Sequence, residues 1–366
     1  MYRGTMRPID PLNRRQDANS DMIILGRESR SLSQKALADA LGVVQATVSK
    51  MEASMLPVSD EMLDHLARAL DYPPRFFLQG GGMLGVGVAE LFHRKRQDVP
   101  KRDLTKIYAQ IDIRTKHVEA LLRSVDFPVN VPRIDIEEYD GQADEVARLV
   151  RASWQLSRGP IKDLTREMEN RGILIIPFDF GTRRVDAISR WVPKLPPIVF
   201  VNPFIPKDRY RFSLAHELAH LIMHSVPHPD IEAQANRFAA EFLVPERSVH
   251  ADFLDLDLPK LAVLKKYWRV SMAVLLKRAE DVGAITPNQT RYLWVQMAKA
   301  GYKTREPIEL DVDGEVPLLL TELTDAHRQD LGFSPDDLGE LLALNGDELV
   351  DLYLRRPDRN RSLYAL

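Results

Sequence analysis

The run His216-Glu-Leu-Ala-His220 constrains this chain more than any other stretch of its sequence. It lies within residues 208–224, where the spacing of apolar residues predicts one amphipathic helix. Residues four apart share a face of a helix, so the two imidazoles can bind one metal ion. Glu217 projects one step around the helix, where its carboxylate can act as a general base on a metal-bound water without being a ligand. The run therefore predicts a metal site of the HExxH type, which is typical of zinc metallopeptidases.

A catalytic zinc site needs a third protein ligand and one open position. A second helix is predicted from Ile231 to Pro245, after a short loop. Glu232 lies in its first turn, twelve residues after His220, and can return to the metal. Asn236 follows one turn later on the same face and can orient a ligand imidazole. Glu241 is the competing carboxylate, but it lies two turns further along.

Four further side chains near the motif are candidates for the surroundings of the metal. His224 continues the face of the two motif histidines, and His228 follows in the loop. More than three histidine ligands would close the site, so we expect both to contact ligands or substrate, with a structural role as the alternative. Tyr210 and Arg211 precede His216 by one to two turns. Tyr210 can stabilise an oxyanion or serve the structure alone.

Three segments of the chain resemble the ImmA/IrrE family of metallo-endopeptidases in residue type, order and spacing: 197–202, 211–224 and 232–245. The resemblance covers roughly residues 140–300. It implies a zincin-like core that cleaves a helix-turn-helix transcriptional repressor. It also implies His216, His220 and Glu232 as ligands of Zn²⁺ and Glu217 as the base. A His₂Glu set also accepts Mn²⁺ or Fe²⁺.

Residues 21–78 predict a second unit of five short helices. Ser33 can cap a helix, and Gly42 supplies the sharp turn that follows it. The segment resembles the phage-repressor (Xre-type) helix-turn-helix, which implies DNA binding. We expect contacts to bases and phosphates from short polar or charged side chains and one alanine: Gln34, Gln45, Ala46, Thr47, Ser49 and Lys50.

The charge of this unit argues against strong DNA binding. Residues 21–78 contain six Lys or Arg and eight Asp or Glu, whereas DNA-binding proteins usually present a basic surface. Arginines among residues 1–20, a region predicted to be a flexible arm, offset part of the deficit. A helix-turn-helix that contacts only protein is the alternative.

We predict a mainly α protein with a small β-sheet in the peptidase, a zincin-like α+β fold. The expected order is a flexible arm (1–20), the helix-turn-helix (21–78), a Gly-rich break and basic helical connector (79–139), the peptidase core (140–255) and a helical C-terminal region (256–366). Strands are expected at 173–176 and 198–201. In the last region, 261–279 resembles a degenerate helix-turn-helix or packs on the peptidase. The acidic tail from 331 is expected to make protein contacts, in self-association or substrate capture.

Composition limits the remaining possibilities. The net charge is −3, and there is no cysteine, which excludes disulfides, thiolate zinc sites and cysteine nucleophiles. No apolar run approaches the length of a membrane span, and the N-terminus lacks a signal-peptide core, so we expect a cytoplasmic protein with no membrane partner. A homodimer remains open.

The sequence therefore predicts a zinc endopeptidase fused to a DNA-binding domain. Its expected partners are a repressor as substrate and operator DNA, and its expected setting is a stress or signal response. Two alternatives remain. One is a DNA-binding regulator whose metal is structural or sensory, and the other is an antitoxin-like protein with a small partner.

Overall fold

The computed structural model describes residues 17–82 and 99–355. Most of the arm expected at 1–20 lies outside these residues, as do Gly85, Gly87 and the basic cluster 94–96. Within them the protein is mainly helical with one three-stranded sheet, as predicted. No helix in the described part is long and apolar enough to cross a membrane.

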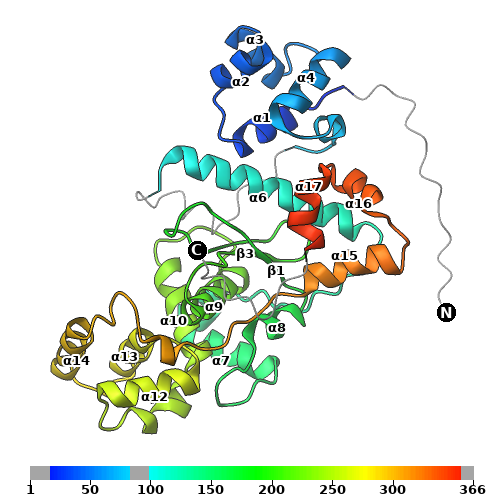
Figure 1. Ribbon diagram of the computed structural model, residues 1–366. Coiled ribbons are helices and arrows are strands. Elements are labelled where there is room, and N and C mark those ends of the chain that lie inside the picture. The colour runs from blue at the N-terminus through cyan, green and yellow to red at the C-terminus, as the bar shows by residue number, and fades with distance from the viewer. Residues whose placement is uncertain (1–16, 83–98, 356–366) are drawn as a thin grey trace.

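The N-terminal unit contains four α-helices and one 3₁₀ helix, at the top of Figure 1: α1 (Ser20–Ser29), α2 (Gln34–Leu41), α3 (Gln45–Glu52), α4 (Asp60–Leu70) and η1 (Pro74–Leu78). Ser33 caps α2 through its side chain, and Gly42 ends that helix in the left-handed conformation (φ 69°). Both match the roles that the sequence predicts for them. The five helices close around a core that includes Leu37, Val48 and Phe76.

A long helix, α6 (Lys101–Leu122), runs beneath the N-terminal unit and is buried on two sides (Figure 1). Ala109 and Ile113 join the core of the N-terminal unit. Ile107 and Ile111 join a second core, under the sheet. The helix expected between 103 and 124 is therefore more than a connector, because it belongs to the packing on both of its sides.

The sheet has the order β1 (Leu174–Pro177), β3 (Ile198–Val201), β2 (Ala187–Arg190). β1 pairs parallel to β3, and β2 pairs antiparallel to it. Side chains of one face, such as Ile188 and Phe200, pack toward α6. Those of the other face, such as Val199, pack toward α9 (Lys207–Met223). Because both faces are covered, β1 and β3 read as continuous apolar runs.

Helices surround α9 and complete the peptidase region: η2 (Ile136–Tyr139), α7 (Ala143–Ser153), α8 (Leu164–Glu169), α10 (Ile231–Leu243), α11 (Glu246–Val249) and η3 (Ala251–Phe253). α10 packs on α9 and on α7. Ala235 and Ala239 of α10 are fully buried, and such small side chains let the two helix axes come close.

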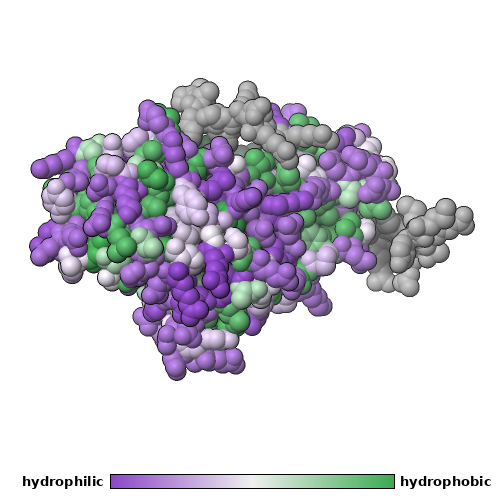
Figure 2. Space-filling view, turned by 90° about the horizontal axis from the view of Figure 1, so that it is seen from below, coloured by the Kyte–Doolittle hydropathy of each residue, from purple (hydrophilic) through white to green (hydrophobic). Residues whose placement is uncertain are grey.

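The C-terminal helices form two groups: α12 (Leu258–Trp268), α13 (Met272–Asp281) and α14 (Pro287–Lys299), followed by η4 (Ile308–Leu310), then α15 (Leu319–Gln329), α16 (Pro335–Leu342), α17 (Gly346–Leu349) and η5 (Val350–Leu354). Buried residues of the first group, among them Leu264, Trp268 and Leu276, belong to the same core as the peptidase helices. This favours the packing alternative for 261–279. Seen from below, the surface is mostly hydrophilic with small hydrophobic patches (Figure 2).

The acidic tail contacts the N-terminal unit of its own chain. Glu348 pairs with Arg30 at 3.1 Å, Glu340 pairs with Arg75 at 3.3 Å, and the Asn345 amide donates to Asp71 at 2.9 Å. Figure 1 shows α16 and α17 lying between α6 and the N-terminal helices. The tail was expected to contact protein, but in self-association or substrate capture. These contacts are instead intramolecular.

Candidate metal centre

Three of the predicted residues converge on one point. The Nε2 atoms of His216 and His220 lie 3.0 Å apart, and the Glu232 carboxylate approaches them at 3.6 Å and 3.4 Å. The two histidines come from α9, and Glu232 comes from the first turn of α10. A tetrahedral site with bonds of 2.0–2.2 Å has ligand-to-ligand edges of about 3.3–3.6 Å. The two distances to Glu232 match these edges and the distance between the imidazoles is slightly shorter, so the three donors can surround one small divalent cation.

Hydrogen bonds fix the orientation of both imidazoles. The Asn236 side-chain oxygen lies 3.1 Å from Nδ1 of His216, so this nitrogen is the donor and Nε2 keeps its lone pair. A similar hydrogen bond assigns the tautomer of His224, whose Nε2 donates to the Gln234 oxygen at 3.1 Å. The His224 ring is neutral, because burial lowers its pKa to about 3.

A neutral His224 that donates through Nε2 must accept through Nδ1. Nδ1 of His220 lies 2.9 Å from that atom, so it donates and leaves the lone pair of its own Nε2 free. Two lone pairs then face each other at 3.0 Å, which is repulsive unless a cation lies between them. The donor set thus fits a metal ion on its chemistry as well as on its spacing.

Glu217 is buried between α9 and the edge of the sheet. Its exposed fraction is 2%, and its Oε2 accepts a hydrogen bond from the backbone N–H of Ser189 at 2.8 Å. Ser189 belongs to β2, a strand that the sequence analysis did not predict. The carboxylate next to the metal donors is therefore held against the edge strand.

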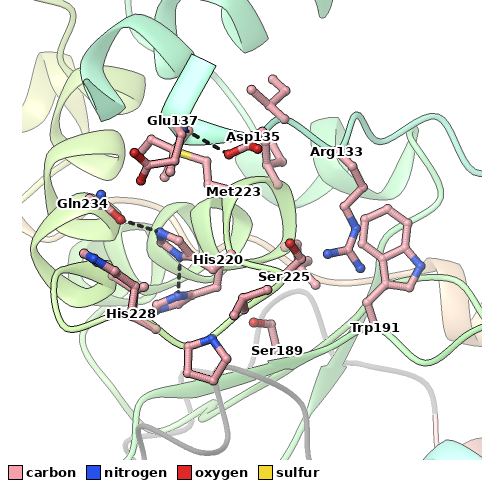
Figure 3. Close-up of a pocket in the computed structure, with 18 of the residues that line it drawn as sticks. Arg133, Asp135, Glu137, Ser189, Trp191, His220, Met223, Ser225, His228 and Gln234 are labelled. Carbon is pink, nitrogen blue, oxygen red and sulfur yellow. Dashed lines mark hydrogen bonds between the residues drawn. The ribbon is translucent and has the colours of Figure 1, made fainter. Parts of the chain in front are cut away.

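A cavity of about 810 Å³ opens beside His220 (Figure 3). The segment 189–191, the segment 133–137 and the segment 220–228 line it, together with Ile231 and Gln234. Arg133 stacks on the indole of Trp191 at 4.0 Å, on the side of the cavity that faces away from Gln234 (Figure 3). His228 also lines the cavity.

The structure does not bring Tyr210 and Arg211 to this cavity. Both are buried, and neither lines it. Arg211 donates to the carbonyl of Ile161 at 2.7 Å and pairs with Glu315. Burial lowers the pKa of Arg211 to about 9 and raises the pKa of Tyr210 above its ordinary value. Both side chains are engaged in packing between α9 and its neighbours.

The competing carboxylate, Glu241, is fully buried away from the metal donors. It pairs with Arg278 and, at 3.4 Å, with Arg148. It also accepts the backbone N–H of Glu246 at 3.1 Å. These partners make it a structural residue that joins α10 to α7 and α13.

Most of the predicted DNA-contacting residues lie on the outer surface of α3. Gln45, Ala46, Ser49 and Lys50 are exposed, and Thr47 is half-buried. Gln34 instead donates to Glu52 at 2.7 Å, which ties the start of α2 to the end of α3.

Sequence reasoning did not find Ser189, Gln234 or Arg133. Gln234 lies two residues after Glu232, but no helical periodicity links it to His224 on the other helix. Arg133 lies in a loop outside any motif. Their roles depend on how separate segments meet.

The fold and the site together define a metallopeptidase joined to a helix-turn-helix DNA-binding domain. Residues 168–280 match the family model of the IrrE N-terminal-like domain, and residues 23–77 match a helix-turn-helix family model. The chain thus contains an IrrE-like metallopeptidase domain and an N-terminal helix-turn-helix domain, as the resemblance implied. No curated protein shows a significant match to the chain.

Proposed function

We propose that this chain is a zinc-dependent endopeptidase in which His216, His220 and Glu232 hold the metal and Glu217 is the general base. The observation that carries this proposal is the convergence of the two imidazole Nε2 atoms, 3.0 Å apart, with the Glu232 carboxylate at 3.4–3.6 Å. Two imidazole nitrogens and one carboxylate are a ligand set that holds catalytic zinc.

A bound divalent cation supplies Lewis acidity, which makes water more acidic and a peptide carbonyl more electrophilic. The chain supplies the proton transfers. Glu217 takes the proton of the attacking water on a carboxylate oxygen and returns it to the leaving amine. Its hydrogen bond to Ser189 holds the carboxylate in place for both transfers.

An extended peptide is the substrate form that suits this site. Among residues 17–82 and 99–355, β2 pairs with β3 alone and so lies at an edge of the sheet. Backbone groups of an edge strand can add hydrogen bonds to an extended chain. The cavity beside His220, with Trp191 and Arg133 on one side, offers room for side chains of that peptide.

We further propose that the substrate is a helix-turn-helix transcriptional repressor and that the setting is a stress or signal response. This part rests on the resemblance to the ImmA/IrrE family. The N-terminal domain would bring the peptidase to operator DNA through α3, whose polar face is exposed.

One observation favours a second reading. Because Glu217 is buried and bonded to Ser189, it could be a structural residue beside a metal that only senses or stabilises. In that case the protein would be a regulator, and its carboxylate would be dispensable for regulation.

The test compares the wild type with Glu217→Gln, which keeps the shape of the side chain and an acceptor for the Ser189 N–H. Each protein is assayed for metal content and mixed with helix-turn-helix repressors from the same cell. Loss of a general base lowers cleavage by about 10²–10⁴-fold. We expect both proteins to carry the metal and only the wild type to cut. If neither protein cuts while both regulate alike, the peptidase proposal is wrong.

A further inference from the structure

Half of the cations of the N-terminal helix-turn-helix domain are engaged in ion pairs within the chain. Six Lys or Arg lie between residues 21 and 78. Three of them form ion pairs with carboxylates of this chain: Arg27 with Glu52, Arg30 with Glu348 and Arg75 with Glu340. The other three are Lys35, Lys50 and Arg68. Phosphate contacts supply much of the affinity for DNA, so a DNA-binding surface here needs cations from elsewhere in the chain.

The first turn of α6 brings such cations to the domain. The Arg102 guanidinium donates to the backbone carbonyl of Ser31 at 2.8 Å. Lys101 and Arg102 are both exposed, and they line a hollow of about 630 Å³ together with the loop 31–33. This hollow separates α6 from the start of α2. The two cations lie outside residues 23–77, the part of the chain that matches the helix-turn-helix model.

The start of α2 connects this turn to α3 through two hydrogen bonds. The loop 31–33 leads directly into Gln34, the first residue of α2. Gln34 in turn donates to Glu52, the last residue of α3. The start of α2 therefore lies between α3 on one side and the first turn of α6 on the other. In Figure 1 the N-terminal part of α6 runs beneath the N-terminal helices.

Lys101 and Arg102 supply the positive charge of the hollow, which Arg27 and Glu28 also line. Arg27 adds none, because it pairs with Glu52 and lies 3.4 Å from Glu28. Asp103 is also in the first turn of α6 and removes part of the positive potential of that turn. The surface nevertheless carries more positive charge than the helix-turn-helix domain alone.

We propose that the first turn of α6 is part of the DNA-binding surface and that Lys101 and Arg102 contact phosphates of a duplex whose major groove is occupied by α3. The inference rests on the proposed DNA-binding role of the helix-turn-helix. It gives α6 a function beyond joining domains. The helix that supports the sheet of the peptidase also touches the DNA, so the position of the duplex relative to the metal site is defined.

The test measures binding of the full chain to a fluorescent mixed-sequence DNA duplex as a function of salt concentration. Each phosphate contact contributes about 0.9 to the slope of log K against log salt. We expect Lys101→Ala together with Arg102→Ala to lower the slope by about 2 and the affinity at low salt by about ten- to a hundredfold. Arg102→Lys keeps the charge and should keep most of the slope.

Two further variants make the outcome specific. Arg123→Ala removes an exposed cation next to the other end of α6 and should leave the slope unchanged. Lys50→Ala removes a cation of α3 and should lower it. If Lys50→Ala weakens binding and the double variant at 101 and 102 binds like the wild type, the inference about α6 is wrong and the helix-turn-helix still binds DNA. If the wild type binds no duplex, the proposed DNA-binding role is wrong, and the inference about α6 is wrong as well.

Discussion

The carboxylate of Glu217 accepts the backbone N–H of Ser189 at 2.8 Å. This bond joins α9, the helix that carries both histidines proposed to bind the metal, to the edge strand β2. The side chain proposed as the base and the strand proposed to bind an extended substrate therefore keep a fixed relation to each other. A shift of β2 would move the Glu217 carboxylate, and a shift of α9 would move β2.

The same helix is tied to the C-terminal region from its other side. Arg211 of α9 pairs with Glu315, which also accepts the backbone N–H of Thr165 at 2.8 Å. A few residues later, α15 begins and leads to the helices that contact the N-terminal domain. Helix α9 is therefore connected to the helix-turn-helix domain through Glu315 and the C-terminal helices.

Two carboxylates of α10 should respond to substitution in opposite ways. Glu232→Ala removes a proposed ligand that is partly exposed, so we expect loss of the metal with little change in the stability of the apoprotein. Glu241→Ala removes the closer of the two carboxylates that pair with buried Arg278 and leaves only Asp144 at 3.6 Å, which costs about 3–5 kcal/mol, while the proposed metal donors remain. Metal content and chemical denaturation separate the two. Loss of metal from Glu241→Ala in its folded state would contradict the ligand assignment.

Asn236→Ala should weaken metal binding without abolishing it. The amide oxygen selects the tautomer of His216 in which Nδ1 carries the proton, and loss of such a partner typically lowers metal affinity by about 10–100-fold. A competition titration with a metal chelator measures the change. The control is Arg237→Ala, at the residue that follows Asn236. It removes an exposed ion pair with Asp144 and should bind metal like the wild type.

Glu169 should make the stability of the protein depend on pH. It is buried, and its Oε1 accepts the N–H groups of Leu318 and Leu319, at 2.9 Å and 2.8 Å. Burial nevertheless raises its pKa to about 7, so the folded state favours the protonated acid. Its contribution is fully present below the unfolded pKa of about 4.5 and is lost as the pH rises through 7.

Glu169→Gln should remove this dependence. The raised pKa corresponds to about 3 kcal/mol between pH 4.5 and pH 7, and the amide keeps an acceptor for the two N–H groups. Denaturation at several pH values should show a flatter profile for the variant in that window. Glu145→Gln changes an exposed carboxyl and should keep the wild-type profile. Equal slopes for Glu169→Gln and the wild type would contradict the assignment.

Gly172 should not tolerate a side chain. It precedes β1 with a φ of 82°, and an added Cβ would lie 2.3 Å from the carbonyl oxygen of Pro128. We expect Gly172→Ala to destabilise the protein by about 3 kcal/mol or more, because backbone strain and a steric clash with backbone atoms add. Gly283→Ala is the control, since its φ is 68° and its Cβ meets no atom within 4 Å. Gly283→Ala should lower the free energy of unfolding by only the backbone strain, about 1–2 kcal/mol. Thermal denaturation compares the two.

The sequence by itself determined the features that depend on local spacing. The helix with both histidines, the helix with Glu232 and Asn236, and the start and end of α2 all follow from periodicity and capping, which act over a few residues. The three donors His216, His220 and Glu232 could therefore be named before their distances were known. The two apolar strands could also be predicted, because strands covered on both faces carry uninterrupted apolar runs.

Only the tertiary structure decided the relations between segments far apart in the chain. β2 reads Ala-Ile-Ser-Arg and has no apolar run, so it exists as a strand because β3 pairs with it. Arg211 and Tyr210 share a helix with two of the proposed metal ligands, yet packing buries both in the core. The acidic tail contacts the helix-turn-helix across more than 300 residues, in the pair of Arg30 with Glu348. Such contacts follow from packing and charge pairing between distant elements, and no periodicity of the sequence encodes them.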